Sequence, residues 1–437
     1  MNAPKKPCSV ILTAGHLLAQ AHEPVVRDAA IAVNDGRVLA AGSAADILAA
    51  FQADTLIDMG ESLLMPGLIN GHTHASMTLL RGIADDLPLL TWLTEHIFPR
   101  EKKLDANLIA LGAKLACAEM TRFGVTAFAD MYLAENAVFE AVETSGLRML
   151  GGEGIFAFPS PGYTTEEEAF ALIREQAARW KGHSRIRVAV MPHAVYTTTP
   201  KLLARCRDTA EELGLSIQMH LAETAHETTE CMKIQGKTPL RYCADLGLVT
   251  DKTTLAHGVV FDDEELDILA ASGACVVHCP RSNMKLSSGI ARVPAMLARG
   301  IPVALGTDGA ASSNNLNMFQ EMATAALLHK VKTEDPTVVA ARSALAMATQ
   351  NGGRALHWPG LGAIVENGPA DIIAVDMTAP NMQPAHSPTS NLVYAATGAE
   401  VRLTMVEGEV LYKDGTYTRY DMDSLRAEVT EAALRIE

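Results

Sequence analysis

Histidine and carboxylate side chains recur at the ends of apolar segments in this sequence, in a pattern that suits a metal centre. His72-Thr73-His74 closes the first segment, and later segments end near His193, His220, Glu223, His257 and Asp308. On a β-strand, residues i and i+2 face the same side, so both imidazoles of the His-x-His pair point the same way. Neutral imidazole is a ligand suited to Zn²⁺ or Fe²⁺. With His220 and Asp308, the pair offers three nitrogens and one carboxylate and leaves a position for water, as catalytic metals require.

Glu223 and His257 are the candidates for chemistry beside such a metal. Glu223 lies three residues past His220, where a strand gives way to a loop, and can curl back without binding the metal. Hydrolysis at an aromatic C–N centre needs a group that carries a proton to the ring nitrogen. His257 would orient the attacking hydroxide or stabilise the developing charge. A single histidine at a strand end usually has a structural role, and a single loop glutamate is usually a solvated surface charge. The recurrence of such residues at the same end of five segments favours a functional site.

The segments that carry these residues alternate with amphipathic stretches such as 106–123 and 166–180. Eight apolar runs can be delimited, at 67–74, 126–131, 148–156, 185–193, 215–223, 253–260, 274–280 and 303–309. Near-continuous apolar strands between helices are typical of a parallel sheet covered by helices. Eight such units predict an α/β fold, a (β/α)8 TIM-like barrel. The polar residues then lie on its C-terminal rim, where barrels of this type build their active sites.

Both ends of the chain are rich in short strands. Residues 30–33 and 38–41 flank Asp35-Gly36, a dipeptide that tight hairpin turns prefer. Residues 371–376 and 404–412 show the same pattern of short strands, with a turn at Glu407-Gly408. We therefore expect a small composite β-sandwich formed by both termini. The predicted division is 1–62 for its first part, 63–363 for the barrel, and 364–437 for its second part with a C-terminal helix.

The composition restricts the class of protein. Of 437 residues, 48% are hydrophobic and 20% charged, which is typical of a globular enzyme with a large core. The net charge is −15 without a lysine or arginine run, so nucleic acid and anionic membranes are not expected as partners, and a small molecule is. No apolar run approaches the roughly 18 residues of a membrane span. Seven scattered cysteines without CxxC spacing indicate buried thiols in a reducing compartment, so we predict a cytoplasmic protein.

Several stretches resemble the amidohydrolase superfamily, and within it the branch that contains methylthioadenosine/S-adenosylhomocysteine deaminases and triazine hydrolases. The similar stretches are Met65-Pro-Gly-Leu-Ile-Asn-Gly-His-Thr-His74, Met219-His-Leu-Ala-Glu-Thr224, Leu255-Ala-His-Gly258, His278-Cys-Pro-Arg-Ser-Asn-Met-Lys-Leu286, Leu305-Gly-Thr-Asp-Gly309 and Gly368-Pro-Ala-Asp371. The resemblance implies a (β/α)8 barrel with a composite β-sandwich, a mononuclear metal site and a homo-oligomer. The reaction it implies is hydrolytic deamination of an adenosine-like nucleoside to the inosine analogue and ammonia.

The resemblance also implies roles for individual positions. The residues that match metal ligands are His72, His74, His220 and Asp308; Glu223 matches the proton shuttle, His257 the residue beside the hydrolytic water, and Asp308 also the base that takes the water's proton. Binuclear relatives have a metal-bridging lysine at the end of the fourth strand. Here that end carries His193, which favours one divalent metal per chain, zinc first with iron(II) as the alternative. In nucleoside deaminases the matching histidine contacts the purine, and a glutamate corresponding to Glu101 binds the ribose; Glu101 could otherwise be a helix-terminal charge.

The substrate prediction depends on an arginine that is missing. Relatives that use S-adenosylhomocysteine resemble one another in having an arginine near the end of the third strand, which grips the amino-acid carboxylate. Here Arg148 opens that strand and Gly151-Gly-Glu-Gly154 occupies its later part, where Glu153 would repel a carboxylate if it faced the pocket. We therefore expect 5′-methylthioadenosine or adenosine to fit better. Trp92 is a candidate for an apolar thioether pocket and equally a candidate core residue.

Three other functions are compatible with parts of this pattern. Guanine or other aminopurine deaminases and triazine aminohydrolases share the metal site and differ in the pocket. A non-catalytic barrel scaffold would be expected to lose metal ligands, and all are retained here. The zinc deaminases that use H-x-E with P-C-x-x-C are excluded, because this sequence has neither motif.

Overall fold

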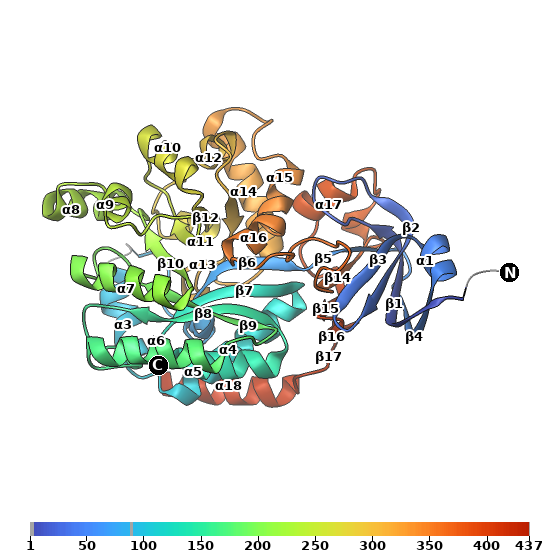
Figure 1. The fold of residues 1–437 in the computed structure, drawn as a ribbon, viewed down its shortest axis with the longest axis horizontal. Coiled ribbons are helices and arrows are strands. Elements are labelled where there is room, and N and C mark those ends of the chain that lie inside the picture. The colour runs from blue at the N-terminus through green and yellow to red at the C-terminus, as the bar shows by residue number, and fades with distance from the viewer. Residues whose placement is uncertain (1–3, 88–90, 437) are drawn as a thin grey trace.

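The computed structural model describes residues 4–87 and 91–436, and the middle of the chain forms an eight-stranded parallel barrel (Figure 1). Its strands pair in chain order: β6 (Leu68–Thr73), β7 (Val125–Tyr132), β8 (Arg148–Ile155), β9 (Ile186–Pro192), β10 (Ser216–Leu221), β11 (Thr253–His257), β12 (Cys275–His278) and β13 (Val303–Leu305). Each strand lies within one residue of, or inside, one of the eight predicted apolar runs. The prediction of a (β/α)8 barrel is confirmed.

Helices on the outside of the barrel follow its strands. They are α4 (Ala106–Arg122), α5 (Glu135–Ser145), α6 (Glu166–Arg179), α7 (Pro200–Leu213), α8 (Ala225–Gln235), α9 (Pro239–Asp245), α10 (Asp263–Ser272), α11 (Pro280–Lys285), α12 (Val293–Ala298), α13 (Ala310–Ser313), α14 (Met318–Thr333), α15 (Ala341–Met347) and α16 (Gln350–Ala355). Helix α6 shows how the sequence sets such an element: Thr165 and Glu168 cap its start reciprocally, and Phe170 and Ile173 bury one face.

The barrel closes between its first and last strands through a side-chain seam. The Asn70 amide nitrogen donates to the Thr307 hydroxyl at 2.7 Å, and the Thr307 backbone N–H donates to the Asn70 amide oxygen at 2.9 Å. One step further along, the Asp308 N–H donates to the His72 carbonyl at 3.0 Å. This seam places Asp308 beside the His-x-His strand, although 236 positions separate Asp308 from His72 in the chain.

A second sheet of nine strands is built from both ends of the chain. Its strands are β1 (Lys6–Leu17), β2 (Val26–Asn34), β3 (Arg37–Ser43), β4 (Phe51–Asp58) and β5 (Ser62–Pro66) from the N-terminal part, and β14 (Ile372–Asp376), β15 (Val401–Val406), β16 (Glu409–Lys413) and β17 (Thr416–Tyr417) from the C-terminal part. Strands β5 and β14 pair antiparallel and join the two parts. Asp35 and Gly36 turn between β2 and β3 with φ of 48° and 73°, as a two-residue hairpin turn requires.

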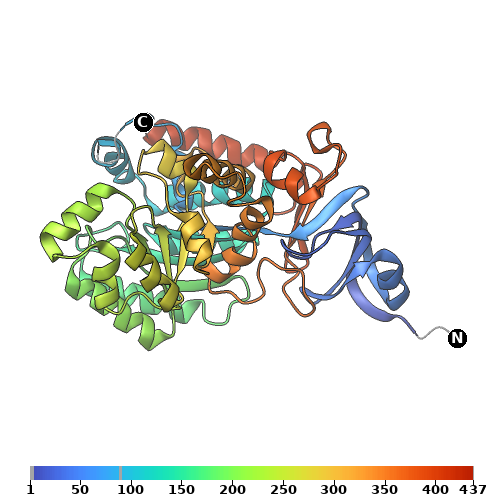
Figure 2. The same ribbon diagram turned by 90° about the horizontal axis from the view of Figure 1, so that it is seen from above.

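The remaining elements pack around the two sheets. They are α1 (Ala44–Ala50), the 3₁₀ helix η1 (Ala75–Leu80), the π-helix η2 (Trp92–Ile97), α3 (Phe98–Glu101), the 3₁₀ helix η3 (Pro380–Met382), α17 (Pro388–Tyr394) and α18 (Met422–Ile436). Figure 2 shows α18 in dark red returning from the terminal sheet to lie along the barrel, where it packs against α4. All seven cysteines are buried free thiols. Among the described helices, none is long and apolar enough to cross a membrane.

Candidate metal centre and active site

The C-terminal ends of the barrel strands bring the predicted site residues together. The seven predicted residues on this rim, His72, His74, His193, His220, Glu223, His257 and Asp308, lie on or within three residues of the ends of β6, β9, β10, β11 and β13. Five of the seven are buried, while His74 and His193 are half-buried. The ring centroids of His72, His74 and His220 are 4.8–5.2 Å apart. The alternation of strands and helices therefore produces one compact cluster from five strands.

Two of the imidazoles have their tautomers fixed by backbone carbonyls. His74 Nδ1 lies 2.5 Å from the Met131 carbonyl, and His220 Nδ1 lies 2.8 Å from the His193 carbonyl. Because a carbonyl only accepts, each Nδ1 carries the hydrogen and each Nε2 keeps its lone pair. The two Nε2 atoms nevertheless face each other at 3.2 Å. Two lone pairs at this distance repel, and a cation between them removes the repulsion.

His72 provides a third ring nitrogen with a free lone pair. The Gln218 amide nitrogen donates to the Gly71 carbonyl at 3.0 Å, which turns its amide oxygen toward His72 Nδ1, 3.4 Å away. His72 Nε2 is buried and, within the described parts of the chain, has no hydrogen-bond partner. Burial lowers the pKa of His72 to about 4, so the ring is neutral at pH 7. A buried neutral imidazole with a free lone pair fits a metal ligand.

Asp308 supplies the carboxylate beside these nitrogens. Its Oδ1 lies 3.3 Å from His74 Nε2 and 3.6 Å from His72 Nε2. The hydroxyls of Ser282 and Ser312 donate to Oδ2 at 2.6 and 3.0 Å, which fixes the carboxylate plane. Burial raises the pKa of Asp308, but the close contact with His72 and the neighbouring imidazoles outweigh it and hold this pKa well below its usual range. The carboxylate is therefore ionised, as a ligand must be.

Strained backbone marks three of these strand ends. Ala222, His257 and Asp308 have φ of 53°, 73° and 61°, in the left-handed region that residues other than glycine rarely adopt. Such conformations each cost about 1–3 kcal/mol and collect at functional sites, where the surrounding structure enforces them. In this rim they turn the chain just past β10, β11 and β13, at the points where a side chain enters the cluster.

Glu223 and His257 lie on the side of the cluster next to the pocket. His257 Nε2 is 4.0 Å from Glu223 Oε2, and the Ser288 hydroxyl donates to Glu223 Oε1 at 3.1 Å. The Asn283 amide nitrogen lies 3.0 Å from His257 Nδ1, which in this orientation accepts, so that Nε2 carries the hydrogen. Burial, and then the charge of Asp308, raise the pKa of Glu223 to about 7. His257 is thus a donor, unlike its three neighbours, and Glu223 is a carboxyl group that can hold a proton near neutrality.

Glu227 organises this loop and was missed by the sequence analysis. Its carboxylate accepts the backbone N–H groups of Ala222 and Glu223 at 3.1 and 2.8 Å. The signal was present in the sequence, because Thr224 caps α8 and Glu227 stands three residues later, as in a capping box. The carboxylate, however, binds the loop before the cap instead of the cap itself.

A pocket of about 470 Å³ opens beside the cluster and contains the remaining predicted residues. Glu101 Oε1 accepts the Tyr132 hydroxyl at 2.9 Å, and burial raises the pKa of Glu101. His193 Nδ1 lies 2.9 Å from the Thr197 hydroxyl, and its ring lies 4.7 Å from that of Phe156. Trp92 is only 5% exposed and is packed as a core residue would be, and it also lines the pocket; its predicted contact with a thioether stays a prediction.

The pocket contains groups that the sequence analysis did not identify. After β8, residues 156–161 bring Phe156, Phe158 and two prolines to its rim, and Lys102 lines it from the end of α3. Lys102 is the single lysine or arginine among the lining residues that the structure describes. The sequence offered one indication of this rim segment, because a stretch rich in proline and glycine follows directly after the strand. The position of Lys102 follows from how η2 and α3 fold, which no local pattern indicated.

The expectations for the third strand need one correction. Arg148 does lie at the opposite end of the barrel, where its guanidinium pairs with Asp371 at 2.7 and 3.1 Å. Glu153 does not face the pocket and repels nothing there. It is 1% exposed, and its carboxylate accepts the N–H groups of Ala134 and Glu135 at the start of α5. The reason is the free N–H groups of a helix start, which attract a carboxylate from the neighbouring strand.

Comparison with known proteins gives the family. The model of the amidohydrolase family matches residues 63–411, and the chain belongs to this family. It is 59% identical over 98% of its length, and 97% of the relative's, to a 5-methylthioadenosine/S-adenosylhomocysteine deaminase of Nitratidesulfovibrio vulgaris strain Hildenborough. A deaminase of the same name from Desulfovibrio desulfuricans is 49% identical over 97% of both chains.

Solved structures give the same fold. A crystal structure of an adenosine deaminase from Xanthomonas campestris with bound zinc has a TM-score of 0.98 and 35% sequence identity, and the match covers 99% of both chains. An atrazine chlorohydrolase from Arthrobacter aurescens complexed with zinc has a TM-score of 0.90 at 22% identity, covering 97% of this chain and 100% of that one. The predicted resemblance to the deaminase branch and its triazine-hydrolase relatives is confirmed.

Proposed function

We propose that this protein deaminates an adenosine-like nucleoside by metal-dependent hydrolysis, with 5′-methylthioadenosine as the preferred substrate. The observation that carries the proposal is the convergence of three imidazole lone pairs and one ionised carboxylate beside a pocket that also holds Glu223 and Glu101. The names of the relatives reported above support the same reaction. The direct test is ammonia release from a panel of purine nucleosides by the purified protein.

The proposed metal ligands are His72, His74, His220 and Asp308, and the proposed ion is one zinc per chain. The fit rests on the facing Nε2 atoms of His74 and His220 and on the unpartnered Nε2 of His72. His257 joins the same cluster by distance, but we assign it a different role because its Nε2 carries hydrogen. When bound, a divalent ion of this kind supplies Lewis-acid activation of water at neutral pH.

The proton path follows from the two carboxyl groups. Asp308 is ionised and its Oδ1 faces the imidazole cluster, so this oxygen accepts a proton from the attacking water. Glu223 can hold a proton near pH 7, and it delivers that proton to the ring nitrogen next to the amino-bearing carbon. The C–O bond forms as the proton arrives. The C–N bond to the amino group then breaks as Asp308 returns its proton to the leaving nitrogen, which departs as ammonia. The new hydroxyl group gives its proton to Glu223 as the C=O bond forms, so Asp308 is again ionised and Glu223 again protonated.

His257 and His193 position the reacting groups. His257 Nε2–H lies 4.0 Å from Glu223 Oε2, and we propose that the attacking water sits beside this gap and accepts a hydrogen bond from His257. His193 stands against Phe156 at the pocket wall, and we propose that it contacts the purine. Such fixed donors and walls hold the nucleoside in the reactive orientation, which contributes to rate through lost rotational freedom.

The ribose and its 5′ substituent would occupy the far side of the pocket. We propose that the Glu101 carboxylate, which Tyr132 holds by a hydrogen bond, accepts from the ribose hydroxyls. Trp92 and Leu93 line the same pocket and form an apolar wall for a methylthio group. The cavity of about 470 Å³ is within the range of roughly 300–1,000 Å³ that suits small ligands.

The preference for 5′-methylthioadenosine over S-adenosylhomocysteine rests on charge. Lys102 is exposed, and an exposed ion pair contributes roughly 0–1 kcal/mol, far less than a buried arginine fork. We expect a higher kcat/KM for 5′-methylthioadenosine in steady-state assays. Equal or better kcat/KM for S-adenosylhomocysteine would reverse the preference, and inactivity on both would move the assignment to guanine or triazine chemistry.

Two further properties are proposed with the function. The chain divides at 62/63 and 363/364 into the two parts of the terminal β domain and the barrel, which limited proteolysis of the purified protein would test. The protein forms a homo-oligomer, which light scattering coupled to gel filtration would test. A monomeric mass in active enzyme would contradict the second proposal.

A further inference from the structure

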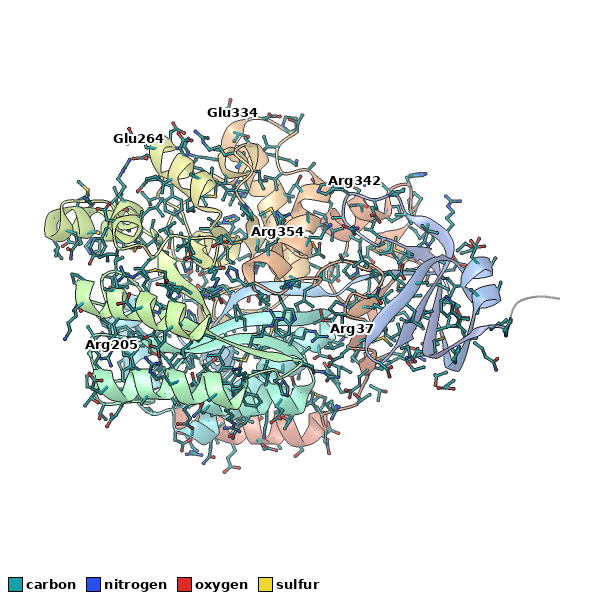
Figure 3. All side chains as sticks on the ribbon, viewed as in Figure 1. Arg37, Arg205, Glu264, Glu334, Arg342 and Arg354 are labelled. Atoms are coloured by element: carbon teal, nitrogen blue, oxygen red, sulfur yellow. The ribbon has the colours of Figure 1, made fainter. Side chains whose placement is uncertain are left out.

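A second and larger cavity, of about 1170 Å³, lies at the end of the barrel opposite the metal centre. The first residues of β8, β9 and β10 line it from the barrel, and the turn between β2 and β3 lines it from the terminal sheet. Figure 3 labels Arg37, the first residue of β3 directly after this turn, where the terminal sheet meets the barrel. The cavity therefore uses both sheets and shares no residue with the site described above.

The charge of this cavity is opposite to that of the molecule. The chain as a whole carries −15, whereas the cavity is lined by six lysine or arginine residues and only three carboxylates. The six cations are Arg37, Arg148, Arg174, Lys181, Arg187 and Lys252. A concave surface with one sign of charge focuses the potential and attracts a ligand of the other sign.

Two of these cations are already neutralised within the protein. Arg148 pairs with Asp371, and Arg174 pairs with Glu212 at 2.7 Å. Arg37 and Arg187 instead donate to backbone carbonyls, those of Asn367 and His357, each at 2.8 Å.

The four other cations, Arg37, Lys181, Arg187 and Lys252, have no carboxylate partner within residues 4–87 and 91–436. The lining also holds Asp35 and Glu366, which form no ion pair among the described residues, so the unpaired cations of the cavity outnumber its unpaired carboxylates by four to two.

Arg187 is the most constrained of the four. Its guanidinium carbon lies 4.2 Å from the centre of the Trp358 ring, and that of Arg148 lies 5.4 Å from the same ring. The residue is exposed, but partial burial of its side chain and repulsion from Arg148 both lower the pKa of Arg187. Stacking on a buried indole fixes the plane of the guanidinium. A fixed guanidinium at a cavity wall offers parallel N–H donors to an oxyanion, and a bound anion would also offset the repulsion between the two arginines.

We propose that this cavity binds a phosphate-bearing small molecule and that Arg187 is its anchoring residue. Phosphate fits this cavity because its oxygens can accept hydrogen bonds from the Arg187 guanidinium, and its negative charges attract the unpaired lysines. The volume exceeds what inorganic phosphate needs and accommodates a nucleotide. Free nucleotides and inorganic phosphates share this chemistry, so the experiment uses both as probes.

The test is calorimetric titration of the metal-loaded full-length protein with pyrophosphate and, separately, with AMP, at low salt. The test variant is Arg187→Gln, and the matched control is Arg174→Gln, which changes an arginine of the same cavity that is already paired with an acid. We expect both probes to bind and Arg187→Gln to weaken binding by about 10- to 100-fold, as expected for a lost hydrogen bond to a charged group. Arg174→Gln should change the affinity less than about twofold.

Several controls separate this site from the metal centre. Metal content is measured after each titration, because pyrophosphate also binds zinc, and Lys252→Gln serves as a second variant should Arg187→Gln unfold. Glu223→Gln should leave pyrophosphate binding unchanged. Tighter binding of AMP than of pyrophosphate identifies a nucleotide site only if Arg187→Gln weakens it, because AMP bound in the adenosine pocket would not depend on Arg187; equal or tighter binding of pyrophosphate identifies an inorganic phosphate site. Absence of binding by the wild type at roughly millimolar probe, or equal binding by Arg187→Gln and Lys252→Gln, would overturn the proposal.

Discussion

The Nε2 atoms of His74 and His220 face each other across 3.2 Å, although a backbone carbonyl holds the hydrogen of each ring at Nδ1. The protein therefore maintains two opposed lone pairs at a cost in folding free energy. Gln218 adds the same constraint to His72. These ligand-directing contacts make the cluster a stronger indication of metal binding than the distances alone.

Metal removal is the first prediction. The purified protein should contain about one divalent metal per chain, and chelation should lower its melting temperature because the opposed lone pairs lose their cation. Zinc should restore the melting temperature. His220→Ala should abolish the binding measured by elemental analysis, while His183→Ala, a change far from the cluster, should not. Two tightly held metals per chain in active enzyme would contradict the mononuclear site.

The second prediction concerns Glu223. Glu223→Gln keeps the shape of the side chain but removes the proton carrier, so kcat should fall by at least about 100-fold with metal content unchanged. Ser288→Ala removes only the hydroxyl that donates to Glu223, and it should reduce kcat by less than about tenfold. Near wild-type turnover by metal-loaded Glu223→Gln would assign the proton transfer to another residue.

The third prediction concerns Asp130, which binds the residues on both sides of His74. Its Oδ1 accepts the Thr73 hydroxyl and the Ala75 N–H, both at 2.6 Å. Asp130→Ala should therefore lower metal affinity by about 10- to 100-fold, the usual effect of losing an outer-shell partner. Asp130→Asn retains an oxygen that can accept, and it should recover most of the affinity in competition titrations with a zinc chelator. Unchanged zinc affinity in Asp130→Ala would show that the strand end holds its shape without this carboxylate.

The fourth prediction is a pH dependence of stability from Glu321. Burial raises the pKa of this carboxyl to about 8 in the folded protein, against an ordinary value of 4.5. Because the folded pKa is the higher one, the contribution of Glu321 to stability is full below pH 4.5 and is lost as the pH rises through 8. Relative to wild type, Glu321→Gln should thus gain unfolding free energy between pH 5 and about pH 8, on the order of a few kcal/mol. Denaturant titrations at both pH values would check this, and a constant difference would contradict it.

The fifth prediction concerns Lys102 and the substrate tail. Lys102→Met removes the single described cation of the pocket but keeps an apolar stem. It should lower kcat/KM for S-adenosylhomocysteine by roughly two- to fivefold, the worth of an exposed ion pair, and leave kcat/KM for 5′-methylthioadenosine unchanged. An equal loss on both substrates would mean that Lys102 supports the pocket wall and does not bind the carboxylate.

The sequence was most informative where local pattern and chemistry coincide. The eight apolar runs predicted the barrel because buried parallel strands have no polar face, and the site residues could be placed because each follows such a run. The orientation of Glu153 could not be predicted, since it depends on the free N–H groups of α5 in a neighbouring unit. The position of Lys102 and the basic cavity could not be predicted for a similar reason. Their neighbours come from segments far apart in the chain, and no local sequence pattern indicates that these segments meet.

The seam between β6 and β13 brings together residues that are synthesised first and last in the barrel, so the proposed metal site is completed late in synthesis. His72 and His74 leave the ribosome long before Asp308, and until Thr307 docks on Asn70 the nascent chain holds only part of the proposed ligand set. A chain arrested before residue 308 therefore lacks the carboxylate and the strand that brings it into place. If the proposed ligands hold a metal, we expect full affinity only after the ring of strands has closed, so that bound metal distinguishes finished molecules from incomplete ones.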